Sequence, residues 1–274
     1  MTDDRSALDH LIPDALKDEG RYDPLRQVDP ALLQQFLKLT GPVVRYFRTS
    51  VEGAWRLPRE EGCLIVSNHA VFAIDAMAFF PSLYMETGRL VRGLADHNLF
   101  KVPVLSALML ELGAVDGNRD NAVRMLRAGE WVVCYPGGAR DALKGAEERY
   151  RLQWEGRLGY LRVALAAGVP IVPVAGVGID EAYVTLGRER SIGRRLFGKA
   201  TYDLPILMGL GPMPLPVKFR FVIGEPVDLE RAFGLGRIFA DAPDEELLPA
   251  HRAIWRHTQA LIDREVGRRV SRFF

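Results

Sequence analysis

Short apolar runs that alternate with helical patterns limit the fold of this 274-residue chain more than any other feature. Buried strands are predicted at residues 62–66, 90–95, 131–135 and 170–177, and helices at 74–84, 103–112, 121–128 and 160–167. Strands that alternate with helices favour an α/β fold, in which a mainly parallel, mixed sheet is covered by helices on both faces. Functional residues in such sheets gather where strands end and loops begin.

The sequence divides into three segments around this alternation. Residues 1–28 are acidic, and their apolar residues do not recur at a sustained helical or strand spacing, which indicates a loosely ordered arm. Residues 29–55 carry amphipathic helical patterns. Residues 56–274 are predicted to form a single α/β domain, with a last strand at 219–223 and one long helix at 244–274.

The N-terminal pattern predicts a pair of helices separated at Gly41 and Pro42. Asp29 suits the N-cap of the first helix, and Pro30 suits its first helical position. Two interpretations stay open for this pair. The helices either cap the core or lie in a bilayer interface with their arginines at the headgroups.

Charge and cysteine content exclude several classes of protein. The 36 Lys and Arg residues nearly balance the 35 Asp and Glu residues, so a net charge of +1 creates no field that would collect nucleic acid. Cys63 and Cys134 both lie in apolar runs, which favours buried free thiols over a disulfide or a metal site. We therefore expect a reducing compartment and neither a metal ion nor a nucleic-acid partner.

No segment of the sequence reads as a secretory signal or a transmembrane helix. The N-terminus opens acidic, and the most apolar stretch, residues 161–179, is broken by Gly168, Pro170 and Pro173. We therefore expect a cytoplasmic protein that is soluble or bound to a membrane surface.

A histidine and an aspartate stand at the end of the first buried strand. His69 follows Ser67 and Asn68 directly, and Asp75 lies six residues later at the start of an apolar helix. A nearby carboxylate could fix the tautomer of His69 and support the imidazolium that forms when the ring takes a proton. His69 is therefore a candidate general base, although a structural role for the pair stays open.

The next element, residues 135–140, reads Tyr-Pro-Gly-Gly-Ala-Arg and also follows a strand. Gly137 and Gly138 allow the backbone to approach a ligand and to direct N–H groups at an oxyanion, and Arg140 offers a fixed cation. An ordinary tight turn with a surface arginine is the alternative. A third element, the loop at residues 113–119, ends in Arg119.

These three elements, followed by the apolar, proline-containing run at residues 169–174, resemble the lysophospholipid/glycerolipid acyltransferase family. That family carries a His/Asp block, a Gly…Arg block, a Pro-x-Gly-x-Arg block and an apolar proline-containing strand, in this order. The resemblance covers about residues 60–180. It implies a glycerolipid-acyltransferase-like fold.

Two departures point to one branch of the family. Five residues separate His69 from Asp75, where the common form has four, and the third block reads Pro-Gly-Gly-x-Arg. Both features resemble the mono- and diacylglycerol acyltransferase-like proteins, which commonly have a downstream acidic residue such as Glu148. They weaken the case for lysophosphatidate as the acceptor.

The resemblance implies an O-acyltransferase without a covalent acyl-enzyme. His69 would remove the proton from an acceptor hydroxyl, with Asp75 orienting the ring, as the oxygen attacks an acyl thioester. The co-substrate would be an acyl-CoA or an acyl-carrier protein, with no further cofactor. The substrate- and oxyanion-binding set that the resemblance implies is Asn68, Arg119, Tyr135, Gly137, Gly138, Arg140 and Glu148.

Three rival functions stay open: a lysophosphatidate or other lysophospholipid acyltransferase, a non-catalytic lipid-binding protein of the same fold, and a thioesterase. A lipid acceptor implies work at a membrane surface, because long acyl chains partition into bilayers. Candidate contact segments are residues 29–48, the arginine run at 188–199 with the Pro/Gly-rich stretch after it, and residues 268–274. The sequence leaves the oligomeric state open.

Overall fold

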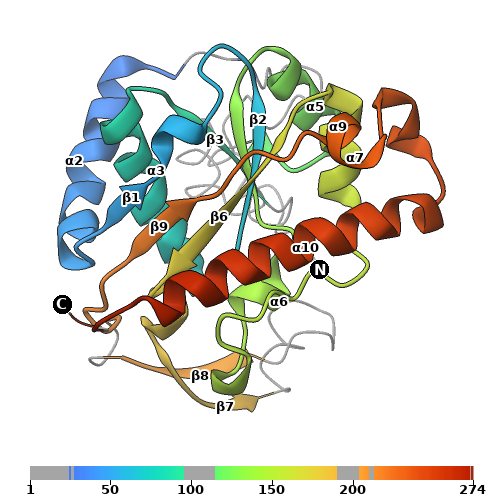
Figure 1. Ribbon diagram of the computed structural model, residues 1–274. Helices are drawn as coiled ribbons and strands as arrows, with labels where there is room; N and C mark the ends of the chain where they lie inside the picture. The colour runs from blue at the N-terminus through green and yellow to red at the C-terminus, as the bar shows by residue number, and fades with distance from the viewer. Residues whose placement is uncertain are drawn as a thin grey trace, which may run out of the picture.

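A seven-stranded sheet forms the centre of the computed structural model (Figure 1). The structure describes residue 25, residues 28–95, 115–189, 204–209 and 213–271, and residue 273. Most of the expected arm at 1–28, the expected helix at 103–112 and the arginine run from residue 190 onward lie outside the described residues.

The sheet is mixed and mainly parallel, as predicted. Its strands, in spatial order, are β1 (Ser50–Glu52), β9 (Arg220–Ile223), β6 (Ile171–Val177), β2 (Cys63–Ser67), β5 (Trp131–Cys134), β3 (Val91–Ala95) and β4 (Val115–Asp116). Only the β6–β9 pair is antiparallel among the described strands of this sheet. A separate antiparallel pair, β7 (Val184–Glu189) and β8 (Leu204–Met208), lies below it (Figure 1).

Helices and short 3-10 turns connect these strands. The α-helices are α2 (Pro30–Tyr46), α3 (Ile74–Thr87), α5 (Arg119–Arg127), α6 (Ala139–Ala142), α7 (Gly159–Ala167), α9 (Leu229–Phe233) and α10 (Asp244–Gly267). The 3-10 turns are η2 (Ala54–Arg56), η3 (Val71–Ala73), η5 (Ala146–Glu148), η6 (Ile179–Glu181) and η7 (Arg237–Asp241).

The central strands are buried on both faces, and their side chains alternate between two hydrophobic clusters. In β2, Leu64 and Val66 join one cluster, whereas Cys63 and Ile65 join the other. Successive side chains of a strand point to opposite faces, so each strand supplies both layers. The near-continuous apolar runs of the sequence are the consequence of this double burial.

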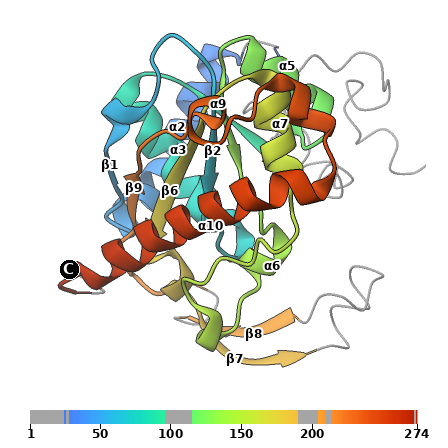
Figure 2. The same cartoon turned by 45° about the vertical axis from the view of Figure 1, so that its right-hand side comes forward.

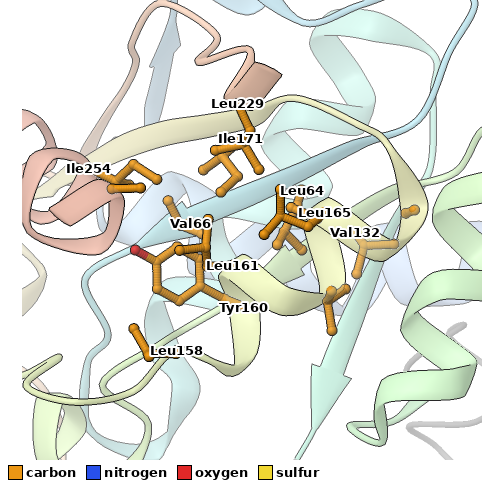
Figure 3. Packing of buried hydrophobic residues seen from close by; sticks show 14 of the residues in the cluster. Leu64, Val66, Val132, Leu158, Tyr160, Leu161, Leu165, Ile171, Leu229 and Ile254 are labelled. Atoms are coloured by element: carbon orange, nitrogen blue, oxygen red, sulfur yellow. The ribbon is translucent and has the colours of Figure 1, made fainter. Parts of the chain in front are cut away.

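One cluster packs the sheet against α5, α7 and α10. Figure 3 shows its centre, where Leu64, Val66 and Ile171 of the sheet meet Leu161 of α7 and Ile254 of α10. The other cluster packs the opposite face against α3 and the end of α2. The long helix α10 accordingly crosses one face over β6, and α2 and α3 lie on the other side (Figures 1 and 2).

The structure differs from the expected N-terminal helix pair. Asp29 does cap the helix, its Oδ1 accepting the N–H of Ala31 at 2.8 Å, but α2 continues through Gly41 and Pro42 to Tyr46. A proline inside a helix removes one backbone hydrogen bond without necessarily ending the helix. After α2, β1 pairs in parallel with β9, so part of the segment 29–55 belongs to the central sheet.

The C-terminal helix is shorter than predicted. It ends at Gly267 rather than at residue 274. Ile254 and Leu261 are buried and Val266 packs against the same cluster, so α10 is attached to the core along its length. None of the helices in the described ranges is long and apolar enough to cross a bilayer.

Candidate active site

Three central strands end at the same edge of the sheet, and the predicted site residues follow two of them. The parallel registers align Val66 of β2 with Cys134 of β5, and Ser67 of β2 with Val174 of β6. Because the carboxyl ends of parallel strands meet, His69, Tyr135 and the loop after Val177 come together at this edge.

His69 and Asp75 form the predicted pair. The Nδ1 atom of His69 lies 3.0 Å from Oδ2 of Asp75, and the Asp75 side chain is only 1% exposed. The intervening chain turns through η3, where Phe72 and Ala73 take left-handed φ angles of 57° and 53°. Left-handed backbone costs a non-glycine residue about 1–2 kcal/mol, so the longer loop is strained while it brings the carboxylate under the imidazole.

The surroundings of His69 make its imidazole a stronger base. Burial alone would lower the pKa of His69, but the charge and hydrogen bond of Asp75 outweigh burial, and the net pKa is raised from 6.5. Tyr135 stacks on the imidazole, with ring centroids 4.0 Å apart and an interplanar angle of 19°. Burial and the Asp75 carboxylate raise the pKa of the Tyr135 hydroxyl, which keeps it protonated. Tyr135 therefore packs on the face of the His69 ring, and Asp75 holds its Nδ1 edge.

The Pro-Gly-Gly turn packs on a buried aspartate. A Cβ atom at Gly137 would lie 2.5 Å from the Asp141 carboxyl, so only glycine fits there. Gly138 has a φ of 51°, and its N–H donates to the Tyr135 carbonyl oxygen at 2.9 Å. The N–H of Gly138 is therefore used within the turn, and the expectation that it faces an oxyanion does not match this geometry.

Asn68 has a structural role in place of the expected substrate contact. Its side chain is fully buried, its Nδ2 donates to the Gly176 carbonyl oxygen at 2.9 Å, and its Oδ1 accepts the Gly176 N–H at 2.8 Å. Both ends of the amide are thus bonded to β6. The side chain fastens the loop before His69 to the neighbouring strand.

The charged members of the predicted set lie on the surface or serve the fold. Arg119 begins α5 and forms an ion pair with Asp241 of η7, with Nη1 2.6 Å from Oδ1. Arg140 lies exposed on α6. Glu148 is half-buried and accepts the Gly145 N–H at 2.9 Å, which closes η5.

A buried charged cluster beside His69 was not predicted. Lys144 Nζ lies 2.9 Å from Asp180 Oδ2 and 3.6 Å from Asp141 Oδ1, and the three side chains are at most 4% exposed. Asp141 also accepts the Gln153 N–H and the Trp154 indole N–H, each at 3.0 Å. The sequence did carry a signal, because Asp180 follows the end of a buried strand, where functional residues gather.

A second network ties the end of α10 to the same loop. The Arg269 Nη2 donates to Glu181 Oε2 at 2.6 Å, and the Tyr150 hydroxyl donates to Glu181 Oε1 at 3.0 Å. Arg268 lies 3.2 Å from Glu265. Two arginines that the sequence suggested for headgroup contact thus form ion pairs within the protein.

The described residues hold no group of three His, Cys, Asp or Glu side chains that could bind a metal ion. Among the described residues, the groups at this edge of the sheet include an imidazole with a carboxylate partner, a glycine turn and a buried lysine between two aspartates. This set can transfer protons and bind polar groups.

Comparison with known proteins finds an acyltransferase domain in this chain. Residues 48–177 match the family model described as Acyltransferase. The chain is 34% identical over 177 residues to proteins of Bos taurus and Homo sapiens described as "DGAT1/2-independent enzyme synthesizing storage lipids", which covers 65% of this chain and 51% and 53% of those proteins. It is 32% identical over 224 residues to an uncharacterised protein of Mycobacterium tuberculosis, covering 79% of this chain and 61% of the relative.

A solved structure shares the fold. The 1-acyl-sn-glycerophosphate acyltransferase of Thermotoga maritima superposes with a TM-score of 0.51 at 19% identity, covering 88% of this chain and 81% of that chain. The chain spans about half to three fifths of the length of the curated relatives given above. The matched family model shows an acyltransferase domain in residues 48–177, and the shared fold agrees with it.

Proposed function

We propose that this protein is an O-acyltransferase that moves a fatty acyl group from acyl-CoA to a hydroxyl of a glycerolipid-type acceptor. The observation that carries the proposal is the His69–Asp75 pair, 3.0 Å from Nδ1 to Oδ2, at the carboxyl edge of the sheet. The Nδ1 atom faces the carboxylate, so Nε2 is the nitrogen that can take a proton from a substrate.

The proposed reaction proceeds in one addition and one elimination. Nε2 of His69 removes the hydroxyl proton as the acceptor oxygen bonds to the thioester carbonyl carbon. The carbon–sulfur bond then breaks, and the leaving thiolate takes the proton back from the imidazolium. Asp75 stabilises the imidazolium between these steps.

The cysteine near the site supports a route without an acyl-enzyme. Burial raises the pKa of Cys134 to about 12, so its thiol stays protonated at neutral pH. A thiol is a weak nucleophile compared with a thiolate. Direct attack by the acceptor hydroxyl is therefore favoured over transfer through Cys134.

Two features of the turn after β5 support the binding of the acyl donor. Gly137 has no side chain to keep a substrate away from its backbone, and its N–H is the proposed oxyanion donor. Arg140 is exposed on α6 and offers a cation to a phosphate of the donor. Arg119, which is paired with Asp241, would need to break that ion pair to do the same.

We also propose that the enzyme works at the cytoplasmic surface of a membrane. Phe72, three residues after His69, is 70% exposed, and Met77 on α3 is 43% exposed. Large apolar side chains at the mouth of a site suit insertion among lipid acyl chains. Co-sedimentation with anionic vesicles should capture the wild type, and Phe72→Ser should weaken capture. Equal recovery in the supernatant with and without vesicles would contradict membrane contact.

One experiment separates the proposed activity from its rivals. The protein is incubated with an acyl-CoA and, in parallel, with water alone, a monoacylglycerol, a diacylglycerol and lysophosphatidate, and the products are identified by mass spectrometry. Acylated neutral glycerolipid is the expected product. Product from lysophosphatidate alone would identify lysophosphatidate as the acceptor. Free fatty acid as the sole product would indicate a thioesterase, and no turnover would indicate a non-catalytic binding protein.

A further inference from the structure

A small cavity lies against the chain segment that directly follows His69. Its volume is about 30 Å³, and its walls include Ala70 and Val71, the two residues after His69, together with Lys144 and Asp180. Asp141 also lines it, and the charges of Asp141 and Lys144 act on the His69 imidazole. A space of this size accepts one or two water-sized polar groups.

Two buried residues of the lining have unused hydrogen-bonding capacity. Lys144 Nζ is ion-paired with Asp180 Oδ2 at 2.9 Å and with Asp141 Oδ1 at 3.6 Å, which leaves one of its three N–H donors without a partner among the described residues. Asp180 Oδ1 is buried and has no hydrogen-bond partner among the residues that the structure describes. Buried polar atoms are almost always satisfied in folded proteins, so this donor and this acceptor call for a ligand.

The charges around the cavity select the kind of ligand. Lys144 and Arg149 contribute two positive charges, and Asp141 and Asp180 contribute two negative charges, so the lining is neutral in sum. A phosphate would have to lie beside two buried carboxylates, which is unfavourable at short range and low dielectric. A hydroxyl fits instead, since it accepts a hydrogen bond from Nζ and donates one to Oδ1.

We propose that Lys144 and Asp180 bind a second, non-reacting hydroxyl of the acceptor while its first hydroxyl reacts at His69. This inference rests on the proposed acyl transfer and adds to it the acceptor class, an uncharged glycerol ester with two free hydroxyls. The pair positions the acceptor and takes no part in proton transfer. A water molecule trapped in the cavity is the competing occupant.

The test compares acceptors that differ only at the second hydroxyl. Wild-type kcat/KM is measured with acyl-CoA and a 1-monoacylglycerol, and then with analogues in which the non-reacting hydroxyl is replaced by hydrogen or by a methoxy group. Loss of this hydroxyl leaves a buried donor and acceptor unpaired, so we expect kcat/KM to fall about tenfold or more. A ratio near one would overturn the inference and indicate only trapped water.

A double variant assigns the effect to the pair. Lys144→Met with Asp180→Asn removes both charges together and keeps an oxygen to accept the Tyr150 N–H, which donates to Asp180 Oδ2 at 2.6 Å. We expect the ratio between the two acceptors to fall to about one, while transfer to the deoxy analogue persists. Lys218→Met, which removes a half-buried lysine away from the cavity lining, should leave the ratio unchanged.

The outcomes separate this inference from the proposed function. Equal rates with the diol and its analogues would contradict only the hydroxyl site, as would an undiminished preference in the double variant. No acyl transfer to any of these acceptors by the folded wild type would refute both. The wild-type comparison needs no variant, so the test holds even if the double variant fails to fold.

Discussion

The imidazole of His69 and the carboxylate of Asp75 lie 3.0 Å apart, although five residues and two left-handed backbone conformations separate them. Asp75 is the second residue of α3, and His69 follows the end of β2. The contact thus joins the edge of the sheet to the first turn of the helix that follows it. The pKa of His69 is raised chiefly because this carboxylate outweighs the effect of burial.

Replacement of Asp75 by asparagine should change both the rate and its pH dependence. General-base catalysis needs neutral His69, so the rate should rise with pH through the raised pKa of this histidine. Without the carboxylate the pKa falls, so the acid limb of the kcat/KM profile should move to lower pH. The plateau should fall by about 10²-fold or more, because the tautomer of the imidazole is no longer fixed.

Asp120→Asn is the matched control for Asp75→Asn. Asp120 is also the second residue of its helix, α5, but it is exposed. Its replacement should leave the pH profile unchanged. An acid limb that stays in place in Asp75→Asn would show that Asp75 does not set the pKa of His69.

The packing of Gly137 on Asp141 predicts a sensitive position. Gly137→Ala places a methyl group 2.5 Å from the Asp141 carboxyl, so the turn or the aspartate must shift. We expect the free energy of unfolding to fall by about 1–3 kcal/mol, measured by urea denaturation, together with a loss of acyl transfer. Gly159→Ala, at a helical glycine with nothing within 4 Å of the added Cβ, should be neutral or stabilising. Equal stability of the two variants would argue against close packing at Gly137.

Glu265 should stabilise the protein in a pH-dependent way. It is 1% exposed and accepts from Arg220 Nη2 at 2.9 Å and from Arg264 Nε at 2.9 Å. Burial alone would raise the pKa of Glu265, but the arginines outweigh it and lower the pKa below 4.5. A lowered carboxyl pKa stabilises the folded state above the unfolded value, and this stabilisation is lost as pH falls through the folded pKa.

Glu265→Gln should therefore cost about 1–2 kcal/mol in urea denaturation at pH 7. The difference from the wild type should shrink below about pH 4.5, where the unfolded carboxyl takes up a proton. Glu147→Gln, at an exposed glutamate, should show little change at either pH. A penalty for Glu265→Gln that is the same at pH 3.5 and pH 7 would exclude the ionised carboxylate as its source.

The two cysteines should resist alkylation in the folded protein. Burial raises the pKa of both Cys63 and Cys134 to about 12, so about 10⁻⁴ of each is thiolate at pH 8. Iodoacetamide at pH 8 should leave both thiols unmodified over minutes by mass spectrometry, and should modify both after unfolding in urea. Rapid native modification of Cys134 would indicate an accessible thiolate beside the site and would reopen covalent transfer.

Much of the fold follows from local pattern, because the central strands are buried on both faces and their apolar runs are unmistakable. The helix–strand alternation predicted β2, β5, β6 and α7 to within a few residues. β1 and β4 were missed because strands of three and two residues carry almost no periodic signal. The continuation of α2 through Pro42 was missed because tertiary packing overrides a local helix breaker.

Contacts within the candidate site were predictable where both residues lie in one sequence motif, and less so where they join distant segments. The contact between His69 and Asp75 was predicted because both residues lie within one short block, and their catalytic role stays a prediction. The bonding of Asn68 to Gly176 and of Arg119 to Asp241 joins residues more than one hundred positions apart, so no local pattern signals it. The Lys144–Asp180 contact also crosses from the turn after β5 to the loop after β6.

The most direct test of the proposed function is the rate of acyl transfer from acyl-CoA to a glycerolipid hydroxyl by His69→Gln. Glutamine keeps a polar group near Asp75 but cannot take the hydroxyl proton, so the purified, folded variant should lose about 10²–10⁴-fold in kcat/KM. Circular dichroism and the unfolding midpoint verify that the variant is folded. Activity within about threefold of the wild type would contradict His69 as the general base.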